Sequence, residues 1–253
     1  MIDTIEGFAR LDALRTGRLD FLDYLDNWLE SLAPLPLEQV IEEAGGPQNV
    51  GIFCVDVING FCHEGALASP RVEAIIEPIT DLFRNAYAAG VENFVLTHDA
   101  HDAAALEFMD YPPHCIGGTE ESKIVPELME LACAPLYHIL PKNCLSSGIG
   151  TGLDAWLEAY PQVTHRIVVG DCTDLCTYHL AMYLKLRANA VNQMHPVILP
   201  ANCVDTYDIP IEVALLEGIP AHPADLFHGM FLYSMSLNGV QTVSQFQFGV
   251  SKT

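Results

Sequence analysis

Basic residues and long apolar runs are both scarce in this sequence. Eleven Lys and Arg stand against 33 Asp and Glu, which gives a formal net charge of -22. Such a surface repels phosphate backbones and anionic lipids, so we expect no nucleic acid and no membrane as a partner, and we favour neutral or cationic substrates over polyanions. No apolar run approaches the roughly 20 residues of a membrane-spanning helix. The N-terminal stretch MIDTIEGFARLDALRTGRLD lacks the apolar segment of a signal peptide.

A disulfide framework and a phosphate-binding loop are missing as well. The eight Cys are scattered through apolar segments of a 253-residue chain. This usage is typical of reduced thiols in a cytoplasmic protein, which is the location we expect. The stretches VGDCTDLC and SSGIGTGL match neither the dinucleotide-binding nor the P-loop spacing.

Apolar runs that alternate with helical segments dominate what is present. The runs lack polar alternation, so each strand is expected to be covered on both faces. This predicts an α/β fold, a three-layer sandwich with a mainly parallel, Rossmann-like central sheet flanked by helices. The predicted strands are residues 50–58, 93–99, 135–142, 165–171, 195–204 and 240–248, and the main predicted helices are residues 69–90, 151–160, 173–190 and 224–239.

The first 45 residues differ from the rest. LDFLDYLDNWLESL spaces its Leu and Trp residues three and four apart, which predicts one apolar stripe on a helix. We therefore expect a helical N-terminal extension, residues 1–45, followed by a hydrolase domain, residues 46–253. The stripe covers either the main domain or another subunit; the first is the commoner outcome, although we expect the protein to be a homo-oligomer.

Chemically useful side chains follow the predicted strands directly. Asp56, Asp99 and Lys142 each end an apolar run, and GDCTDLC follows RIVV. In an open parallel sheet, ligands bind at the carboxyl ends of the strands. We therefore expect these groups to meet at one edge of the sheet.

Cys176 is the candidate nucleophile, because it lies in the first turn of the predicted helix, with Thr173 and Asp174 as expected caps. The positive end of the helix dipole is expected to lower the pKa of its thiol. Free backbone N–H groups near Cys172 and Cys176 could hold a developing oxyanion. The alternative is that Cys176 is a small buried apolar residue, as most free Cys are. Asp56 can accept the thiol proton, and a neighbouring Lys142 can keep that carboxylate ionised.

The stretch THDAHDAAALEFMDYPPHC offers metal ligands. Asp99 and His101 point the same way on an extended segment, and His114 follows a rigid Pro-Pro corner. Two imidazoles and a carboxylate suit Zn, Fe or Mn, with open positions for water or a pyridine nitrogen. The alternative is a polar loop at a strand end.

Three segments together resemble a known family. VDVINGFCHEGAL resembles the VDxQNDFxxGGxL signature of the isochorismatase-like cysteine hydrolases, and VVGDCTDLCTYHLA resembles their GxxTDxCVxxTA segment. DAHDAAALEFMDYPPHCIGGTEESKIVPEL resembles the metal and pocket segment of the nicotinamidase branch. The resemblance runs from about residue 50 to about residue 205.

The resemblance implies a catalytic triad of Asp56, Lys142 and Cys176. It also implies an oxyanion hole formed by the backbone N–H groups of Cys172 and Cys176, after a cis peptide bond between Asp171 and Cys172. The implied reaction is metal-dependent hydrolysis of nicotinamide, or a similar small neutral amide, to the acid and ammonia. It passes through a cysteine thioester, and the process it implies is NAD salvage.

The same resemblance implies the metal ligands and the substrate pocket. The ligands of a divalent metal, with zinc the first choice and iron or manganese the alternatives, are Asp99, His101, His114 and, less strongly supported, Glu107. The residues implied to hold the substrate ring are Phe61, Leu67 and Tyr111, for which plain core packing is the alternative.

Several positions depart from the family pattern. Gly60 replaces an Asp, Asp171 and Cys172 replace small apolar residues, and the segment after Lys142 is short, with Gly148 where an aromatic residue is usual. The pocket is expected to be wider there, which leaves room for another small-amide or carbamoyl hydrolase of the superfamily. An isochorismatase-type hydrolase is a third reading, and an inactive scaffold a fourth.

Overall fold

The computed structural model describes residues 4–249, with side chains from residue 14 onward. The chain separates into two compact units, residues 1–32 and 33–253. The first unit consists of one 27-residue helix, α1 (Thr4–Glu30), which includes all but the last two residues of the segment predicted to be helical, 19–32. Among the described residues, no helix is both long enough and apolar enough to cross a membrane.

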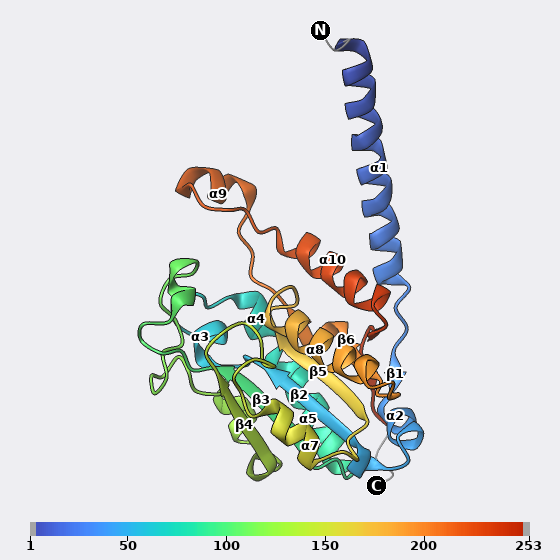
Figure 1. Ribbon diagram of the computed structural model, residues 1–253, viewed down its shortest axis with the longest axis vertical. Coiled ribbons are helices and arrows are strands. Elements are labelled where there is room, and N and C mark those ends of the chain that lie inside the picture. The colour runs from blue at the N-terminus through green and yellow to red at the C-terminus, as the bar shows by residue number, and fades with distance from the viewer. Residues whose placement is uncertain (1–3, 250–253) are drawn as a thin grey trace. The chain divides into compact units, whose positions relative to one another are not determined.

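The second unit is built on a parallel sheet (Figure 1), which confirms the predicted fold class. Its seven strands follow the order β4-β3-β2-β5-β6-β8, and β7 also pairs with β5. Every pairing in this sheet is parallel. The strands are β2 (Val50–Val55), β3 (Asn93–Asp99), β4 (Tyr137–Lys142), β5 (His165–Asp171), β6 (Val197–Pro200), β7 (Val204–Asp205) and β8 (Gln241–Val243).

Helices and short turns connect these strands. The α-helices of this unit are α2 (Leu37–Glu43), α3 (Asn59–Cys62), α4 (Pro70–Ala74), α5 (Ile76–Ala88), α6 (Pro126–Met129), α7 (Leu153–Ala159), α8 (Cys176–Ala190), α9 (Ile211–Glu217) and α10 (Ala224–Leu237). The 3-10 turns are η1 (Pro47–Asn49), η2 (Leu106–Met109), η3 (Ala134–Leu136) and η4 (Ala201–Cys203).

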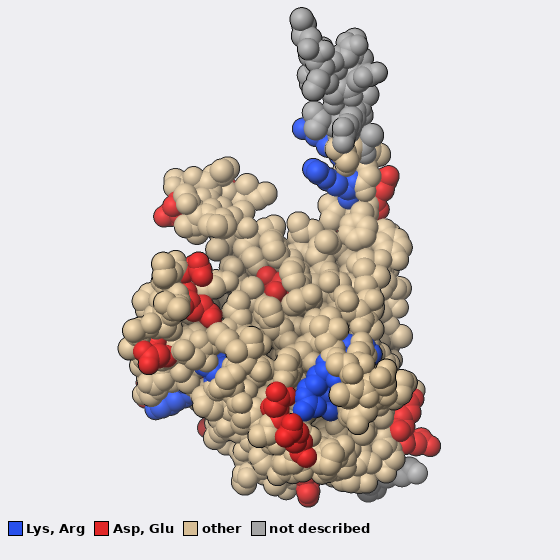
Figure 2. Space-filling model, in the orientation of Figure 1, with Lys and Arg blue, Asp and Glu red and all other residues tan. Residues whose placement is uncertain are grey.

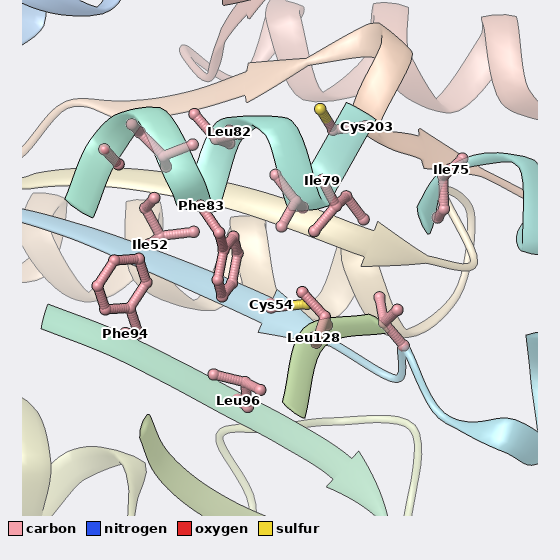
Figure 3. Packing of buried hydrophobic residues seen from close by; sticks show 14 of the residues in the cluster. Ile52, Cys54, Ile75, Ile79, Leu82, Phe83, Phe94, Leu96, Leu128 and Cys203 are labelled. Carbon is pink, nitrogen blue, oxygen red and sulfur yellow. The ribbon is translucent and has the colours of Figure 1, made fainter. Parts of the chain in front are cut away.

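Both faces of the sheet are covered, which explains why the strands carry no polar alternation. On one face, Ile79 and Phe83 of α5 pack with Ile52 of β2 and Phe94 of β3, as Figure 3 shows. On the other face, the rings of Phe53 and of Trp156 in α7 pack at 88° to each other, with centroids 5.5 Å apart. Successive residues of β2 therefore enter different halves of the core.

The strand predicted over 195–204 is divided into β6, η4 and β7, and the structure differs from the predicted elements in three further places. The helix predicted over 69–90 is broken at Ile75 into α4 and α5. Pro78 lies in the first turn of α5, where its missing N–H costs no helical bond, whereas one continuous helix would place it in the interior. The last predicted strand is divided into β8 and β9 (Phe246–Gln247), and β9 pairs with β1 (Leu35–Pro36). Residues 33–45 therefore contribute to the second unit.

The third difference is an arm, residues 208–222, that the prediction did not contain. An antiparallel bridge between Ile209 and His222 closes its base, and α9 at its end stands away from the sheet (Figure 1). The Leu215 and Leu216 side chains of α9 are 80% and 81% exposed.

Charged side chains do not gather into a basic surface on the face drawn in Figure 2. Acidic groups lie over several elements there, and Lys and Arg groups lie in separate places, one of them a small patch beside acidic groups near the centre of the view. This distribution agrees with the excess of acidic residues in the sequence.

Candidate active site

Three side chains from separate strand ends meet at the carboxyl edge of the sheet. Asp56 follows β2, Lys142 ends β4, and Cys176 is the first residue of α8. The Lys142 Nζ atom lies 2.8 Å from Asp56 Oδ2 and 3.5 Å from Cys176 Sγ. All three residues are buried. The structure therefore brings together the three residues that the resemblance implied as a triad.

Asp56 is held by its backbone as well as by its carboxylate. Its φ angle is 58°, a left-handed conformation that Asp tolerates better than most residues. Its Oδ1 atom accepts a hydrogen bond from the backbone N–H of Asp99 at 2.8 Å. Burial and the charge of Asp99 raise its pKa to about 7, although Lys142 opposes the shift. A carboxyl group in this state can both accept and return a proton near neutrality.

Lys142 lies between two carboxylates. Its Nζ atom is 2.6 Å from Asp99 Oδ1, in addition to its contact with Asp56. Burial alone would lower the pKa of this ammonium group, but Asp56, Cys176 and Asp99 outweigh burial, and the pKa is raised well above its ordinary value. Lys142 is therefore a fixed positive charge in the site.

The pKa of the Cys176 thiol differs from the prediction. The helix dipole was expected to lower its pKa, but burial raises it well above the ordinary value, and Lys142 opposes this only in part. The resting side chain is therefore a thiol that needs a proton acceptor beside it. The expected caps are also wrong: α8 begins at Cys176 with Leu175 at the N-cap position and no side-chain cap.

The turn before α8 presents two unpaired backbone donors. The peptide bond between Asp171 and Cys172 is cis, as the resemblance implied. The N–H groups of Leu175 and Thr177 both donate to the carbonyl oxygen of Cys172. Within the described residues 4–249, the N–H groups of Cys172 and Cys176 donate to no protein acceptor. Two free donors in one turn beside a thiol can bind an oxyanion.

Asp99, His101 and His114 form a buried cluster of metal-ligand type. One donor atom from each of the three lies within 4.8 Å of the others. The Nδ1 atom of His114 is 2.8 Å from the carbonyl oxygen of Pro112, so this nitrogen carries the proton and Nε2 is left as a ligand. The Nε2 atom of His101 lies 3.3 Å from Oδ1 of Asp99, and within the described residues neither buried ring nitrogen of His101 makes a hydrogen bond. Unpaired imidazole nitrogens beside a carboxylate fit a divalent cation of the zinc type.

Glu107 lies outside this cluster of three. Its Oε2 atom accepts a hydrogen bond of 3.2 Å from the backbone N–H of Leu145. Its Oε1 atom is buried and makes no hydrogen bond with any residue that the structure describes. Glu107 thus links the segment between Asp99 and His114 to the segment after Lys142 and retains one unused acceptor.

Aromatic rings surround His114. The ring centroid of Phe61 lies 5.6 Å from that of His114, and the centroid of Tyr111 lies 6.3 Å from it. Phe108, which the sequence analysis missed, lies 5.3 Å from His101 and 5.6 Å from His114. The only indication of Phe108 in the sequence was its place within the stretch THDAHDAAALEFMDYPPHC. Leu67 is half-buried and packs against the main core cluster.

Two of the departures from the family pattern have steric reasons. A Cβ atom on Gly60 would lie 2.5 Å from the Sγ atom of Cys115, so a larger residue there would have to displace Cys115. A Cβ atom on Gly148 would lie 2.5 Å from the ring of Tyr183, a residue of α8. The space beside Gly148 is therefore filled by an aromatic ring from another element.

Comparison with known proteins bears on this site. The family model of the isochorismatase domain matches residues 50–219. Nicotinamidase 1 of Arabidopsis thaliana is 31% identical over 215 residues, which cover 79% of this chain and 87% of that protein. The nicotinamidase/pyrazinamidase of Mycobacterium tuberculosis is 32% identical over 143 residues, 51% of this chain and 75% of that protein.

Solved structures share the fold. A cysteine hydrolase from Pseudomonas syringae superposes with a TM-score of 0.67 at 20% identity, over 84% of this chain and 92% of that one. A nicotinamidase from Bacillus subtilis superposes with a TM-score of 0.59 at 25% identity, over 77% and 99% of the two chains. The first of these likenesses shows the fold alone.

Proposed function

This chain belongs to the isochorismatase family, as its motifs predicted, and we propose that it hydrolyses nicotinamide, or a similar small neutral amide, to the carboxylic acid and ammonia. The observation that carries the proposal is the contact of the Lys142 ammonium group with both Asp56 and Cys176. The relatives named nicotinamidase support the choice of an amide substrate. Nicotinate formed in this way would feed NAD salvage, and the eight free cysteines favour a reducing compartment such as the cytoplasm.

The first half-reaction forms a thioester. Asp56 accepts the thiol proton of Cys176 as the sulfur attacks the amide carbonyl carbon. The carbonyl oxygen becomes an oxyanion, which the N–H groups of Cys172 and Cys176 can bind. The proton held by Asp56 then passes to the amide nitrogen, and the C–N bond breaks with release of ammonia. Lys142 offsets the negative charge that builds up during this step.

The second half-reaction restores the enzyme. Asp56 takes a proton from water, and the resulting hydroxide attacks the thioester carbonyl carbon. The C–S bond breaks, the acid product leaves, and the sulfur of Cys176 regains its proton. Amide and water are thereby converted to acid and ammonia with no other reactant.

Asp99, His101 and His114 would hold a divalent metal, with Glu107 as a nearby acceptor, because their donor atoms lie close together. In the described part of the chain, the ring nitrogens of His101 and the Oε1 atom of Glu107 make no hydrogen bond. Zinc is the first choice for this donor set, and iron or manganese are alternatives. When bound, the metal supplies a Lewis acid that can bind a pyridine nitrogen or water. Phe61, Phe108 and Tyr111 would enclose an aromatic substrate ring beside it, with Leu67 behind.

The test is ammonia release from nicotinamide and from a panel of other small amides and carbamoyl compounds. We expect turnover of nicotinamide by the wild type and none by Cys176→Ala. The matched control is Cys133→Ala, which removes another buried thiol at the opposite end of β4 and should retain turnover. Full activity of Cys176→Ala would refute the assignment of Cys176 as the nucleophile. Faster turnover of a carbamoyl compound than of nicotinamide would show that the substrate is a carbamoyl compound.

A further inference from the structure

His222, at the base of the arm, reaches into the turn that precedes Cys176. Its Nε2 atom lies 2.8 Å from Oδ2 of Asp174, and its Nδ1 atom lies 2.8 Å from the carbonyl oxygen of Tyr207. A carbonyl oxygen and an ionised carboxylate can only accept hydrogen bonds. With Asp174 ionised, both ring nitrogens of His222 must therefore donate. Two donating nitrogens define an imidazolium ion, and the contact with Asp174 is therefore an ion pair.

The electrostatic balance agrees with this assignment. Burial lowers the pKa of His222, but the hydrogen bond and charge of Asp174 outweigh burial, and the pKa is raised. Burial raises the pKa of Asp174, but the hydrogen bond from His222 reverses that effect, and the pKa is lowered. Both groups are buried, with 8% of His222 and 6% of Asp174 exposed.

Aromatic rings enclose the imidazolium on both faces. The Tyr207 ring is stacked on it at 3.9 Å and 12°, and the Phe227 ring at 4.2 Å and 20°. Faces of aromatic rings attract cations, and the attraction increases when water is excluded. The stack therefore favours the charged ring and fixes its plane toward Asp174.

The position of Asp174 gives this pair a chemical role. Asp174 belongs to the same turn as the two free N–H groups, two positions before Cys176. A buried carboxylate that lacked a counter-ion there would oppose an oxyanion in the same turn. Two other basic groups lie near this turn. Arg71 pairs with Asp205 and Asp225, and the Nδ1 atom of His228 lies 2.9 Å from the Thr173 hydroxyl, where burial lowers the pKa of its ring. His222 is thus the cation that compensates Asp174.

We propose that His222 is a positioning residue for the amidase reaction: it holds Asp174 in place and cancels its charge, so that the turn carrying the Cys172 and Cys176 N–H groups can bind an oxyanion. This inference rests on the proposed function, because the oxyanion arises in the hydrolysis of the amide. It also gives the arm a link to catalysis, since His222 pairs with Ile209 where the arm joins the body.

The first test is His222→Gln, which can still donate to Asp174 but carries no charge. We expect kcat to fall by about 10- to 100-fold, less than the loss of a direct oxyanion donor, while KM changes by less than about threefold. The matched control is His138→Gln, because His138 also lies against two aromatic rings, at 5.7 Å from Trp156 and 5.3 Å from Tyr160. His138 has no carboxylate partner among the contacts described for it, and its replacement should leave kcat unchanged.

The second test is the double variant Asp174→Asn/His222→Gln, which replaces the ion pair by two neutral amides. If charge compensation is the role of His222, the double variant recovers kcat by at least about fivefold over His222→Gln, as coupled residues do in a double-mutant cycle. A double variant as slow as His222→Gln would overturn the proposal. So would a rise in KM with unchanged kcat in the single variant.

A third measurement separates this inference from the proposed function. The 15N spectrum of the wild-type protein at pH 6 should show both ring nitrogens of His222 protonated, with the signal assigned by its loss in His222→Gln. A neutral ring there would overturn the inference even if nicotinamide is hydrolysed. A charged ring with the expected kcat pattern on any amide of the panel would support it even if nicotinamide is not the substrate.

Discussion

Replacement of Lys142 by Met removes the positive charge around which the site is built. The ammonium group lies 2.8 Å from Asp56 and 2.6 Å from Asp99. At an effective dielectric constant of about 20, each contact is worth about 6 kcal/mol of Coulomb attraction, most of which offsets the cost of burying the charges. Loss of one member of a buried ion pair typically costs about 3–5 kcal/mol, because the partner charge is left without compensation.

We therefore expect Lys142→Met to lower the free energy of unfolding by about 3–5 kcal/mol, a large share of the about 5–15 kcal/mol of a typical domain. Ammonia release should fall below detection. Urea unfolding, monitored by circular dichroism on chelator-treated protein, measures the first quantity without a bound cation in the place of the lost charge. The matched control is Lys123→Met, since Lys123 pairs with Glu120 on the exposed surface. It should stay within about 0.5 kcal/mol of the wild type.

The companion variant Lys142→Met/Asp99→Asn should regain part of the lost stability, because it leaves Asp56 without a second buried carboxylate beside it. Wild-type stability and wild-type turnover in Lys142→Met would refute the reasoning. That outcome would mean that neither carboxylate depends on the ammonium group.

Three further predictions follow from particular contacts. Gly60→Ala should destabilise the protein by about 1–3 kcal/mol in urea unfolding, because its Cβ atom would lie 2.5 Å from the Cys115 sulfur, whereas Gly117→Ala, with its nearest contact at 3.5 Å, should be tolerated; equal effects would contradict this. Dialysis against a chelator should lower ammonia release, and zinc, iron or manganese should restore it; a metal-free sample of full activity would exclude a required metal. The pKa of His222 is raised, so its contribution to stability is complete below its ordinary value of 6.5 and is lost as the pH rises through the raised value. The pKa of Asp174 is lowered, so its contribution is complete above 3.8 and is lost as the pH falls. Asp174→Asn/His222→Gln should therefore cost most stability between about pH 4 and 6.5, and a cost that does not vary with pH would contradict the ion pair.

Much of the fold follows from patterns that a single sequence carries. Continuous apolar runs identify strands that are covered on both faces, and the order of strands and helices identifies the parallel sheet. The break between α4 and α5 was also predictable, because Pro78 cannot lie in the interior of one helix. The helix α9 had a start and an end signal in Pro210 and Gly218, which has a φ of 69°. It was missed because α9 has seven residues, too few for a helical spacing of apolar residues to be distinguished in the sequence.

The sequence likewise allowed some residues of the site to be predicted and others not. The residues that end strands could be placed together from the sequence, since parallel strands share one carboxyl edge. Contacts between distant positions could not. His222 meets Asp174 across 48 positions, and nothing local in the sequence indicates which of the ten His meets which carboxylate. Phe108 was missed for the same reason, because a ring beside a histidine is a property of the folded loop.

The protonation state of Cys176 shows why position on a helix is a weak guide to reactivity. A helix N-terminus stabilises a negative charge by about 0.3–1 kcal/mol, and by about 2 kcal/mol in favourable geometries. Complete burial can shift a pKa by about 3–5 units, which corresponds to about 4–7 kcal/mol in the opposite direction. Burial therefore outweighs the dipole at this thiol, in agreement with the raised pKa. Activation must come from groups that act only when they are in contact with the sulfur, namely the Lys142 charge at 3.5 Å and the neighbouring carboxyl of Asp56. The same fold with the same helix, but without these two contacts, would hold an inert buried cysteine.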